Sequence, residues 1–327
     1  MARWGFNTVQ LFISWQDLEQ VPPTYNILTH RLVHHYNGPY VTGLDQAIAR
    51  FRRAGLAVVL SMMQSRWSGA FQNITTSDGA HYPCGLGMPA WLYERNGQAA
   101  GGAAAMVQAE VGFYQNRTVV KGLNGVGSEP IRTSFTKAWQ YLASRYRRNR
   151  TVVGAVPMFE AYDILTRSYP GASGITPATL RLAKFFEQIG GAIHRVNPRL
   201  LIFFTEQKSR TTHKWALLRR PRVRNGVVTT EFYAGRWPVD GKNRLRLHYR
   251  RARGWHYPFY VDEFDAFGKT RTMAHPHWRT DTRKMLAYCR FHHISWTLLT
   301  YGPQYFQVLG RPRTAKRAVL RVIRRGF

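Results

Sequence analysis

Short apolar runs alternate with longer amphipathic segments along most of the chain, and this alternation restricts its fold more than any other feature. Most neighbouring runs are separated by a spacer long enough to hold a helix. Strands that alternate with helices pair in parallel, so the pattern predicts an α/β protein. Seven runs have the composition of buried strands: Thr8–Ile13, Leu56–Met62, the start of Thr151–Asp163, Leu200–Thr205, Gly226–Thr230, Pro258–Val261 and His293–Thr300.

Helical periodicity is clearest between Ser134 and Arg148, where apolar side chains recur every three or four residues. The segment 64–130 is different, because it is rich in glycine, alanine, asparagine and threonine. It predicts an elaborated loop region with one helix inside a single domain that covers residues 1–327. Further helices are predicted at Gly43–Gly55, Pro177–Val196, Asp281–Phe291 and Arg313–Arg324.

Seven strands in 327 residues predict a (β/α)8 barrel of the TIM type that lacks its first strand and first helix. An open, doubly wound sheet is the alternative architecture. The glycine-rich dinucleotide motif that such a sheet often carries is absent after the first predicted strand, and the chain has no P-loop. The barrel is therefore the favoured fold.

The net charge of +30 comes from 47 Lys and Arg against 17 acidic residues. Such a balance indicates an anionic partner, either an acidic surface, an acidic polymer or nucleic acid. No cluster matches a nucleic-acid motif, and an arginine-rich surface without a partner is the alternative. The basic clusters lie at Arg145–Arg150, Arg219–Arg224, Lys242–Arg253 and Arg311–Arg325.

Four of the few acidic residues follow predicted strands. They are Glu160, Glu206, Glu231 and Glu263. The carboxyl ends of all strands in a parallel barrel open onto one face, where catalytic groups lie. A core strand that ends in a solvated acid, or an acid paired with one of the many arginines, explains the same positions without catalysis.

Two carboxylates that face each other across a cleft can hydrolyse a glycosidic bond. One delivers a proton to the leaving oxygen, and the other attacks the anomeric carbon. Aromatic rings near the strand ends suit stacking on sugars, although core packing explains them equally well. These aromatic residues are Trp15, Trp67, Trp91, Tyr233, Trp296 and Tyr301.

Several motifs in order carry a resemblance to glycoside hydrolase family 5. The segment GFNTVQLFISWQDLEQVPPTYN at residues 5–26 resembles the family's second-strand region. The runs at 138–163, 259–268, 293–303 and 309–319 resemble its fourth, seventh and eighth strand regions and its last helix. The motif MPAWLY resembles the endoglycoceramidase-like branch, whose members cleave glycolipids. The resemblance therefore covers nearly the whole chain.

The resemblance implies a retaining glycosidase that uses no cofactor and no metal. It makes Glu160 the acid/base and Glu263 the nucleophile. It also implies a carbohydrate or glycolipid substrate, a monomer, and a secreted or extracytoplasmic location. The residues expected to bind substrate are Trp296, Tyr233, Trp15, Gln64 and Trp91.

The chain departs from the family pattern around both glutamates. Phe159 stands where the family has an Asn that holds the sugar 2-hydroxyl, and Ala161 replaces the Pro after the acid/base. Gln10, Met63 and Glu231 stand where an Arg, a His and a His are usual. A barrel that binds carbohydrate without cleaving it is therefore an alternative, and a binder of nucleic acid or an acidic polymer is another.

The family's first strand and helix precede the segment that begins at Gly5. We therefore expect that the natural protein is longer than the 327 residues and that this chain is a truncated form. We expect the basic exterior to favour anionic surfaces, without a specific nucleic-acid partner.

Overall fold

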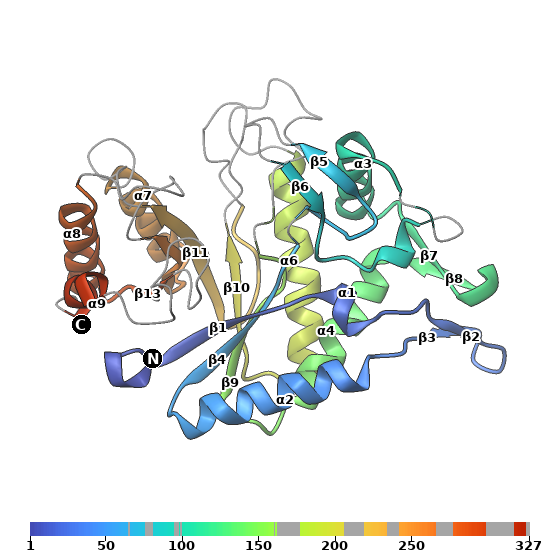
Figure 1. The fold of residues 1–327 in the computed structure, drawn as a ribbon, viewed down its shortest axis with the longest axis horizontal. Helices are drawn as coiled ribbons and strands as arrows, with labels where there is room; N and C mark the ends of the chain where they lie inside the picture. The colour runs from blue at the N-terminus through green and yellow to red at the C-terminus, as the bar shows by residue number, and fades with distance from the viewer. Residues whose placement is uncertain are drawn as a thin grey trace. The chain divides into compact units, whose positions relative to one another are not determined.

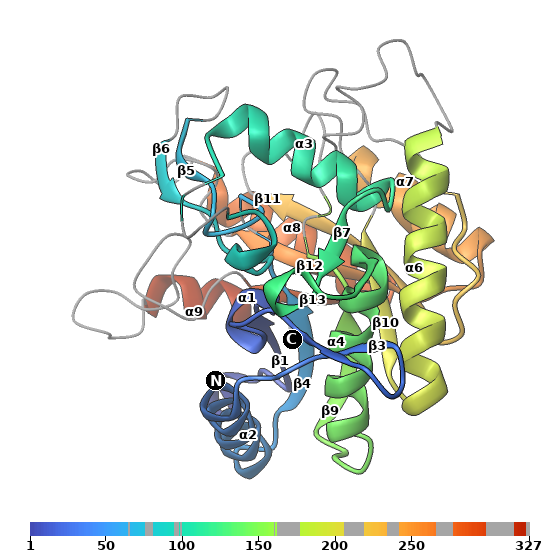
Figure 2. The same ribbon diagram turned by 90° about the vertical axis from the view of Figure 1, so that its right-hand side faces the viewer.

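The computed structural model describes residues 1–64, 66–75, 81–94, 98, 100–159, 161, 177–205, 219–233, 242–265, 277–298 and 317–324. The chain divides into two compact units. The larger unit holds residues 10–53 and 58–225, and the smaller unit holds residues 1–9, 54–57 and 226–327. Each unit alternates strands and helices along the chain (Figures 1 and 2).

The strands of the larger unit follow the order β1 (Thr8–Ile13), β4 (Ala57–Met62), β9 (Val152–Val156) and β10 (Leu201–Thr205). Strand β9 pairs in parallel with β4 on one side and with β10 on the other. Its residues are almost all buried, as is typical of a parallel strand covered on both faces. These four strands lie within one residue of their predicted starts.

Within the described residues, five helices accompany these strands: α1 (Trp15–Leu18), α2 (Gly38–Arg53), α3 (Ala103–Tyr114), α4 (Ile131–Arg145) and α6 (Pro177–Val196). Helices α3, α4 and α6 share an aromatic core in which Phe113, Phe135 and Phe185 pack with ring centroids 5.4 to 6.0 Å apart. Helix α2 begins five residues before the predicted Gly43, because proline is tolerated in the first turn of a helix.

The described part of the larger unit also contains three short hairpins and two 3-10 turns. The hairpins are β2 (Thr24–Asn26) with β3 (Arg31–Val33), β5 (Gln72–Thr75) with β6 (His81–Cys84), and β7 (Val119–Lys121) with β8 (Ser128–Pro130). The turns are η2 (Ala90–Leu92) and η3 (Leu123–Gly125). Strands of three or four residues are too short to show an alternating pattern, so the sequence did not indicate them.

The smaller unit contains, as far as the structure describes it, three strands that pair in parallel: β11 (Gly226–Tyr233), β12 (Phe259–Asp265) and β13 (Ser295–Leu298). Its helices are η1 (Ala2–Trp4), α7 (Lys242–Gly254), α8 (Trp278–Phe291) and α9 (Arg317–Arg324). Helix α7 appeared in the sequence only as a basic cluster. Strands β11 and β12 run three and four residues past their predicted ends, and both therefore include an acidic residue expected beyond them.

Candidate active site

Two acidic residues lie side by side at the carboxyl ends of β11 and β12. Glu231 and Glu263 are partners in the parallel register, after an irregularity between Thr230 and Glu231. Glu263 is only 4% exposed, and Asp262 beside it is also buried. Partners in a parallel ladder lie on neighbouring strands about 4.8 Å apart. The adjoining ends of β11 and β12 therefore carry three acidic residues, Glu231, Asp262 and Glu263.

A hydroxyl group holds one of these carboxylates. Thr229 Oγ1 donates to Asp262 Oδ2 at 2.7 Å, from one strand to the next. A hydrogen bond to a buried charged group stabilises the charged form. Asp262 is therefore oriented within the strand pair, next to the predicted nucleophile Glu263.

Trp296 lies in β13, in register with Val261 of β12. Its ring meets Phe264 edge-on at 5.8 Å and Phe6 at 6.0 Å, and it remains partly exposed. The structure thus places this predicted sugar platform one strand from Glu263. Tyr233 ends β11 opposite Asp265, and its side chain lies outside the described residues.

In the larger unit, an aromatic pair occupies the end of β9. Phe159 is buried and packs against Phe12 with a centroid distance of 4.9 Å. Its backbone N–H donates to Met62 O at 2.8 Å, and its carbonyl accepts from Gln64 Nε2 at 3.1 Å. Gln64 is thus a buried residue that binds the backbone beside Glu160. Glu160 itself lies outside the described residues, as do Glu206 and Tyr301.

Gln10 and Met63 occupy the positions where the family carries basic side chains. Gln10 Nε2 donates to Ser61 Oγ at 3.2 Å, while its Oε1 is buried without a hydrogen-bond partner in the described part of the chain. The backbone N–H of Met63 donates to Ile13 O at 2.8 Å. Neither side chain can supply the positive charge that the family pattern has at this position.

Trp15 and Trp91 both bond to Glu19. Trp15 is fully buried, donates to Glu19 Oε2 at 2.8 Å and packs against Phe135. Trp91 is partly exposed, and its Nε1 donates to Glu19 O at 2.9 Å. Trp67 is likewise fully buried. Trp15 therefore has no surface that a sugar could reach in this structure.

A buried charged network lies around the same glutamate. His34 Nδ1 is 2.6 Å from Glu19 Oε1, and His34 Nε2 is 2.9 Å from Glu129 Oε1. Ser134 and Lys137 also donate to Glu129. The sequence did not indicate this network, since its members lie far apart in the chain and none follows a predicted strand.

Burial and hydrogen bonding oppose each other in this network. Burial by itself lowers the pKa of His34, but the bonds to Glu129 and Glu19 outweigh it and raise that pKa. Burial raises the pKa of Glu129, but bonds from His34, Lys137 and Ser134 outweigh it and lower the pKa to about 2. The network therefore joins His34 to two carboxyl groups, and its hydrogen bonds favour the protonated form of His34.

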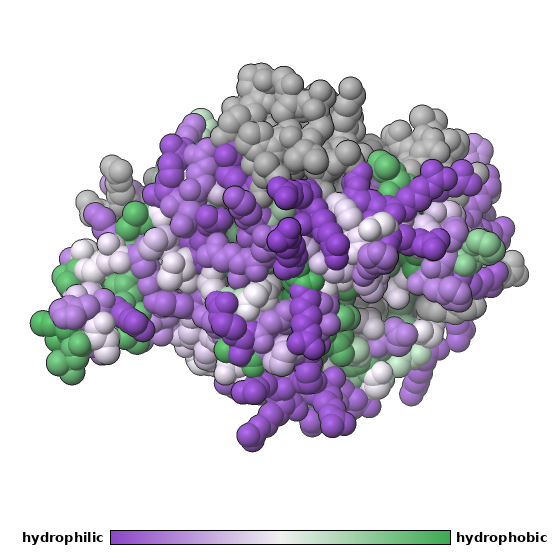
Figure 3. Space-filling view, turned by 180° about the vertical axis from the view of Figure 1, so that it is seen from behind, coloured by the Kyte–Doolittle hydropathy of each residue, from purple (hydrophilic) through white to green (hydrophobic). Residues whose placement is uncertain are grey.

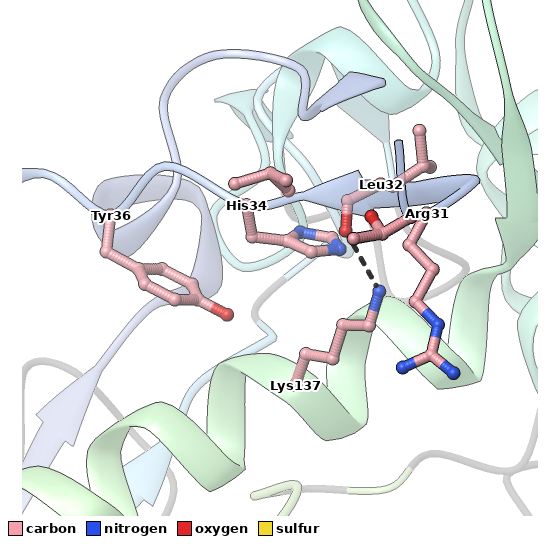
Figure 4. A pocket seen from close by; sticks show the side chains of 7 residues that line it. Arg31, Leu32, His34, Tyr36 and Lys137 are labelled. Carbon is pink, nitrogen blue, oxygen red and sulfur yellow. Dashed lines mark hydrogen bonds between the residues drawn. The ribbon is translucent and has the colours of Figure 1, made fainter. Parts of the chain in front are cut away.

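An open pocket of about 610 Å³ lies beside this network. Figure 4 shows that Arg31, His34 and Tyr36 come from the hairpin segment and that Lys137 comes from α4. The ammonium group of Lys137 donates a hydrogen bond to Leu32 O. The pocket is lined by Thr29, Arg31, Leu32, Val33, His34, Tyr36 and Lys137. None of these lining residues belongs to β11 or β12.

Within the described residues, no cluster of three or more His, Cys, Asp or Glu side chains is arranged to hold a metal ion. In the same part of the chain, no helix is long and apolar enough to cross a membrane.

Barrel enzymes present their catalytic groups at the carboxyl ends of parallel strands, which is where these acidic residues lie. Comparison with known proteins specifies the class further. The chain belongs to the cellulase family, glycosyl hydrolase family 5, whose pattern it matches over residues 1–304. It is thus a glycosidase with a fold of the (β/α)8 type, which the sequence predicted without its first strand and helix.

Solved structures share this fold at low sequence identity. Endo-glycoceramidase II from Rhodococcus sp. aligns with a TM-score of 0.68 and 18% identity over 98% of this chain and 70% of that chain. An endogalactoceramidase aligns at 0.67 and 18% over 92% and 64%. Pseudomonas stutzeri endoglucanase Cel5A aligns at 0.57 and 12% over 99% and 82%. No curated protein sequence matches the chain significantly.

Proposed function

We propose that the chain is a retaining glycosidase that cleaves a β-linked glycan or glycolipid, with Glu263 as nucleophile and Glu160 as acid/base. The observation that carries this proposal is the position of Glu263, which is buried at the carboxyl end of β12 in a chain of glycosyl hydrolase family 5. A nucleophile at the end of a barrel strand is held by the strand's own hydrogen bonds and needs little reorganisation.

In the first step, a Glu263 carboxylate oxygen bonds to the anomeric carbon while the bond to the leaving oxygen breaks. Glu160 gives its proton to that oxygen. In the second step, water attacks the anomeric carbon, Glu160 takes a proton from it, and the bond to Glu263 breaks. The two inversions together retain the anomeric configuration. Trp296 would support the sugar ring by stacking.

A glycolipid is the substrate class that we favour. One of the structural neighbours, endo-glycoceramidase II, is known as a complex with ganglioside GM3, and another is an endogalactoceramidase. The motif MPAWLY, which ends at Tyr93, supports the same branch. Its Tyr93 hydroxyl accepts from Trp67 Nε1 at 2.8 Å, so the motif anchors a buried tryptophan.

The proposal is tested with Glu160→Gln and Glu263→Gln. Each variant should lose hydrolysis of an activated aryl β-glycoside by several orders of magnitude while its thermal unfolding stays close to that of the parent. The anomer formed first is read by proton NMR, and retention is expected. Unchanged rates in both variants, or an inverted first product, would refute the assignment.

A second function is favoured by the aromatic pair at Phe159. Phe159 packs against Phe12 and, by the resemblance to the family, stands in the position of an Asn that holds the sugar 2-hydroxyl, a contact that strengthens in the transition state. A barrel that binds carbohydrate without cleaving it would show saturable binding of oligosaccharides and no turnover. Met63→His with Phe159→Asn would then create hydrolysis in a protein that has none.

A further inference from the structure

Large aliphatic side chains are exposed at the turn between β2 and β3. Ile27 is 75% exposed and Leu28 is 88% exposed, which makes Leu28 the most exposed large hydrophobic residue among those described. Leu123 and Val126, in the turn between β7 and β8, are also exposed. We call these four residues the apolar tip. Exposed apolar surface of this kind marks sites of protein or membrane interaction when it is contiguous.

The two turns belong to one supported structure. Leu123 N–H donates to Pro23 O at 2.7 Å, and β3 contacts β8. A hydrogen bond between the buried His34, which follows β3, and Glu129 in β8 also joins the two hairpins. The apolar tip is therefore presented by two hairpins that are bonded to each other.

The turn that carries Ile27 and Leu28 is also ordered locally. Asn26 Oδ1 accepts the backbone N–H of Leu28 at 2.9 Å and that of Thr29 at 3.0 Å. The Tyr25 hydroxyl lies 2.9 Å from His30 Nδ1 across the turn. Asx bonding of this kind fixes a turn. The turn that carries the aliphatic side chains is thus already ordered in the free protein, which reduces the conformational entropy lost on binding.

Basic residues belong to the same two hairpins as the apolar tip. Arg31 and Lys121 are exposed, and Arg31 and Lys137 line the pocket beside the β2–β3 hairpin together with Tyr36 (Figure 4). The acidic Glu129 nearby is already bonded by His34, Ser134 and Lys137. An aliphatic tip with a cationic border matches an anionic lipid surface, where apolar groups enter the boundary and cations meet phosphates.

The position of the tip relates it to the catalytic face. The chain leaves the carboxyl end of β1 at Ile13 and reaches β2 at Thr24, so the hairpin extends from a strand end. In a parallel barrel, the active site lies at those ends. Figure 1 draws β2 and β3 at its right-hand edge. Figure 3 views the molecule from behind, so this edge lies at its left, where hydrophobic residues are visible.

We infer that the apolar tip docks the protein on a bilayer that carries anionic phospholipids. Ile27 and Leu28 enter the headgroup boundary, while Arg31 and Lys121 contact lipid phosphates. The reason for such docking rests on the proposed function, because a glycolipid substrate lies in a membrane. The contact itself does not require catalysis, so it can be tested separately.

The test is co-sedimentation with vesicles of phosphatidylcholine, alone or with phosphatidylserine. The variant Ile27→Ser/Leu28→Ser should bind the mixed vesicles about tenfold more weakly than the parent or worse. Arg31→Gln should bind the mixed vesicles more weakly and leave the weak binding to phosphatidylcholine unchanged. The control is Phe291→Ser, since Phe291 is 78% exposed on α8, outside the tip. It should bind as the parent does.

Two further measurements separate this inference from the proposed function. Glu263→Gln should bind vesicles normally even if it hydrolyses nothing, and Ile27→Ser/Leu28→Ser should keep the parent's rate on a soluble aryl glycoside. Equal vesicle binding by the parent and the tip variant would overturn the inference. So would a parent dimer in gel filtration that Ile27→Ser/Leu28→Ser abolishes, since a second copy would then cover the tip.

Discussion

Glu231 and Glu263 stand opposite each other on neighbouring parallel strands, and Glu263 is almost completely buried. The family pattern has a histidine where this chain has Glu231. The exchange therefore replaces a neutral or positive neighbour of the proposed nucleophile with a negative one.

Glu231→Gln should move the acid limb of the pH–rate profile for kcat/KM to lower pH, by about one unit or less. Removing the negative neighbour favours the carboxylate form of Glu263 that attacks the sugar. Glu231→His should move the limb in the same direction. The measurement is kcat/KM for an aryl β-glycoside from acid to neutral pH. An unchanged acid limb in both variants would show that the pair is not coupled.

Replacement of Phe159 should separate packing from chemistry. Phe159→Asn removes the contact with Phe12 and buries an amide, so it should lower the free energy of unfolding by about 3 kcal/mol. Phe159→Leu keeps an apolar side chain and should cost about 1–2 kcal/mol. Urea unfolding measures both. An equal cost for the two variants would mean that the site accepts the amide without penalty.

The His34 network should make stability depend on pH in two directions. The raised pKa of His34 contributes to the free energy of unfolding. This contribution is fully present below pH 6.5, the ordinary pKa of histidine, and is lost as pH rises through the folded-state pKa. The lowered pKa of Glu129 gives stability that is present above 4.5 and is lost as pH falls toward about 2. Both contributions are complete between 4.5 and 6.5.

His34→Gln should therefore lower stability by about 3 kcal/mol or more in that window and flatten the loss of stability at higher pH. His35→Gln is the matched control, because His35 is exposed and bonds only to Thr24 Oγ1 within the described residues. Thermal unfolding at a series of pH values measures the difference. The same pH dependence in His34→Gln and the parent would contradict the assignment.

Two adjacent glycines in α6 provide a test of packing. A Cβ at Gly190 would lie 2.8 Å from Val223 Cγ1, whereas a Cβ at Gly191 would meet nothing within 4 Å. Gly191→Ala should stabilise the protein by about 0.5–1 kcal/mol through helix propensity. Gly190→Ala should gain less or destabilise, because Val223 must move. Chemical unfolding of the two variants side by side measures the contrast, and equal gains would contradict this packing.

The long, periodic elements were predictable from sequence. Strands β1, β4, β9 and β10 and helices α4 and α6 follow apolar patterns that local sequence determines. The ends of β11 and β12 were not predictable, because the charged residues Glu231 and Glu263 were expected to lie just beyond the end of each strand. Pairing between the two strands continues beyond these acidic residues, so both strands are longer than predicted.

The sequence by itself determined the family, the alternation of strands and helices, and the glutamates that follow strands. These depend on local periodicity and on the order of motifs along the chain. Only the tertiary structure decided which side chains meet. Glu231 lies beside Glu263, Trp15 is buried against Phe135, and His34 lies between two carboxylates, because contacts between distant segments depend on how the strands and hairpins pair.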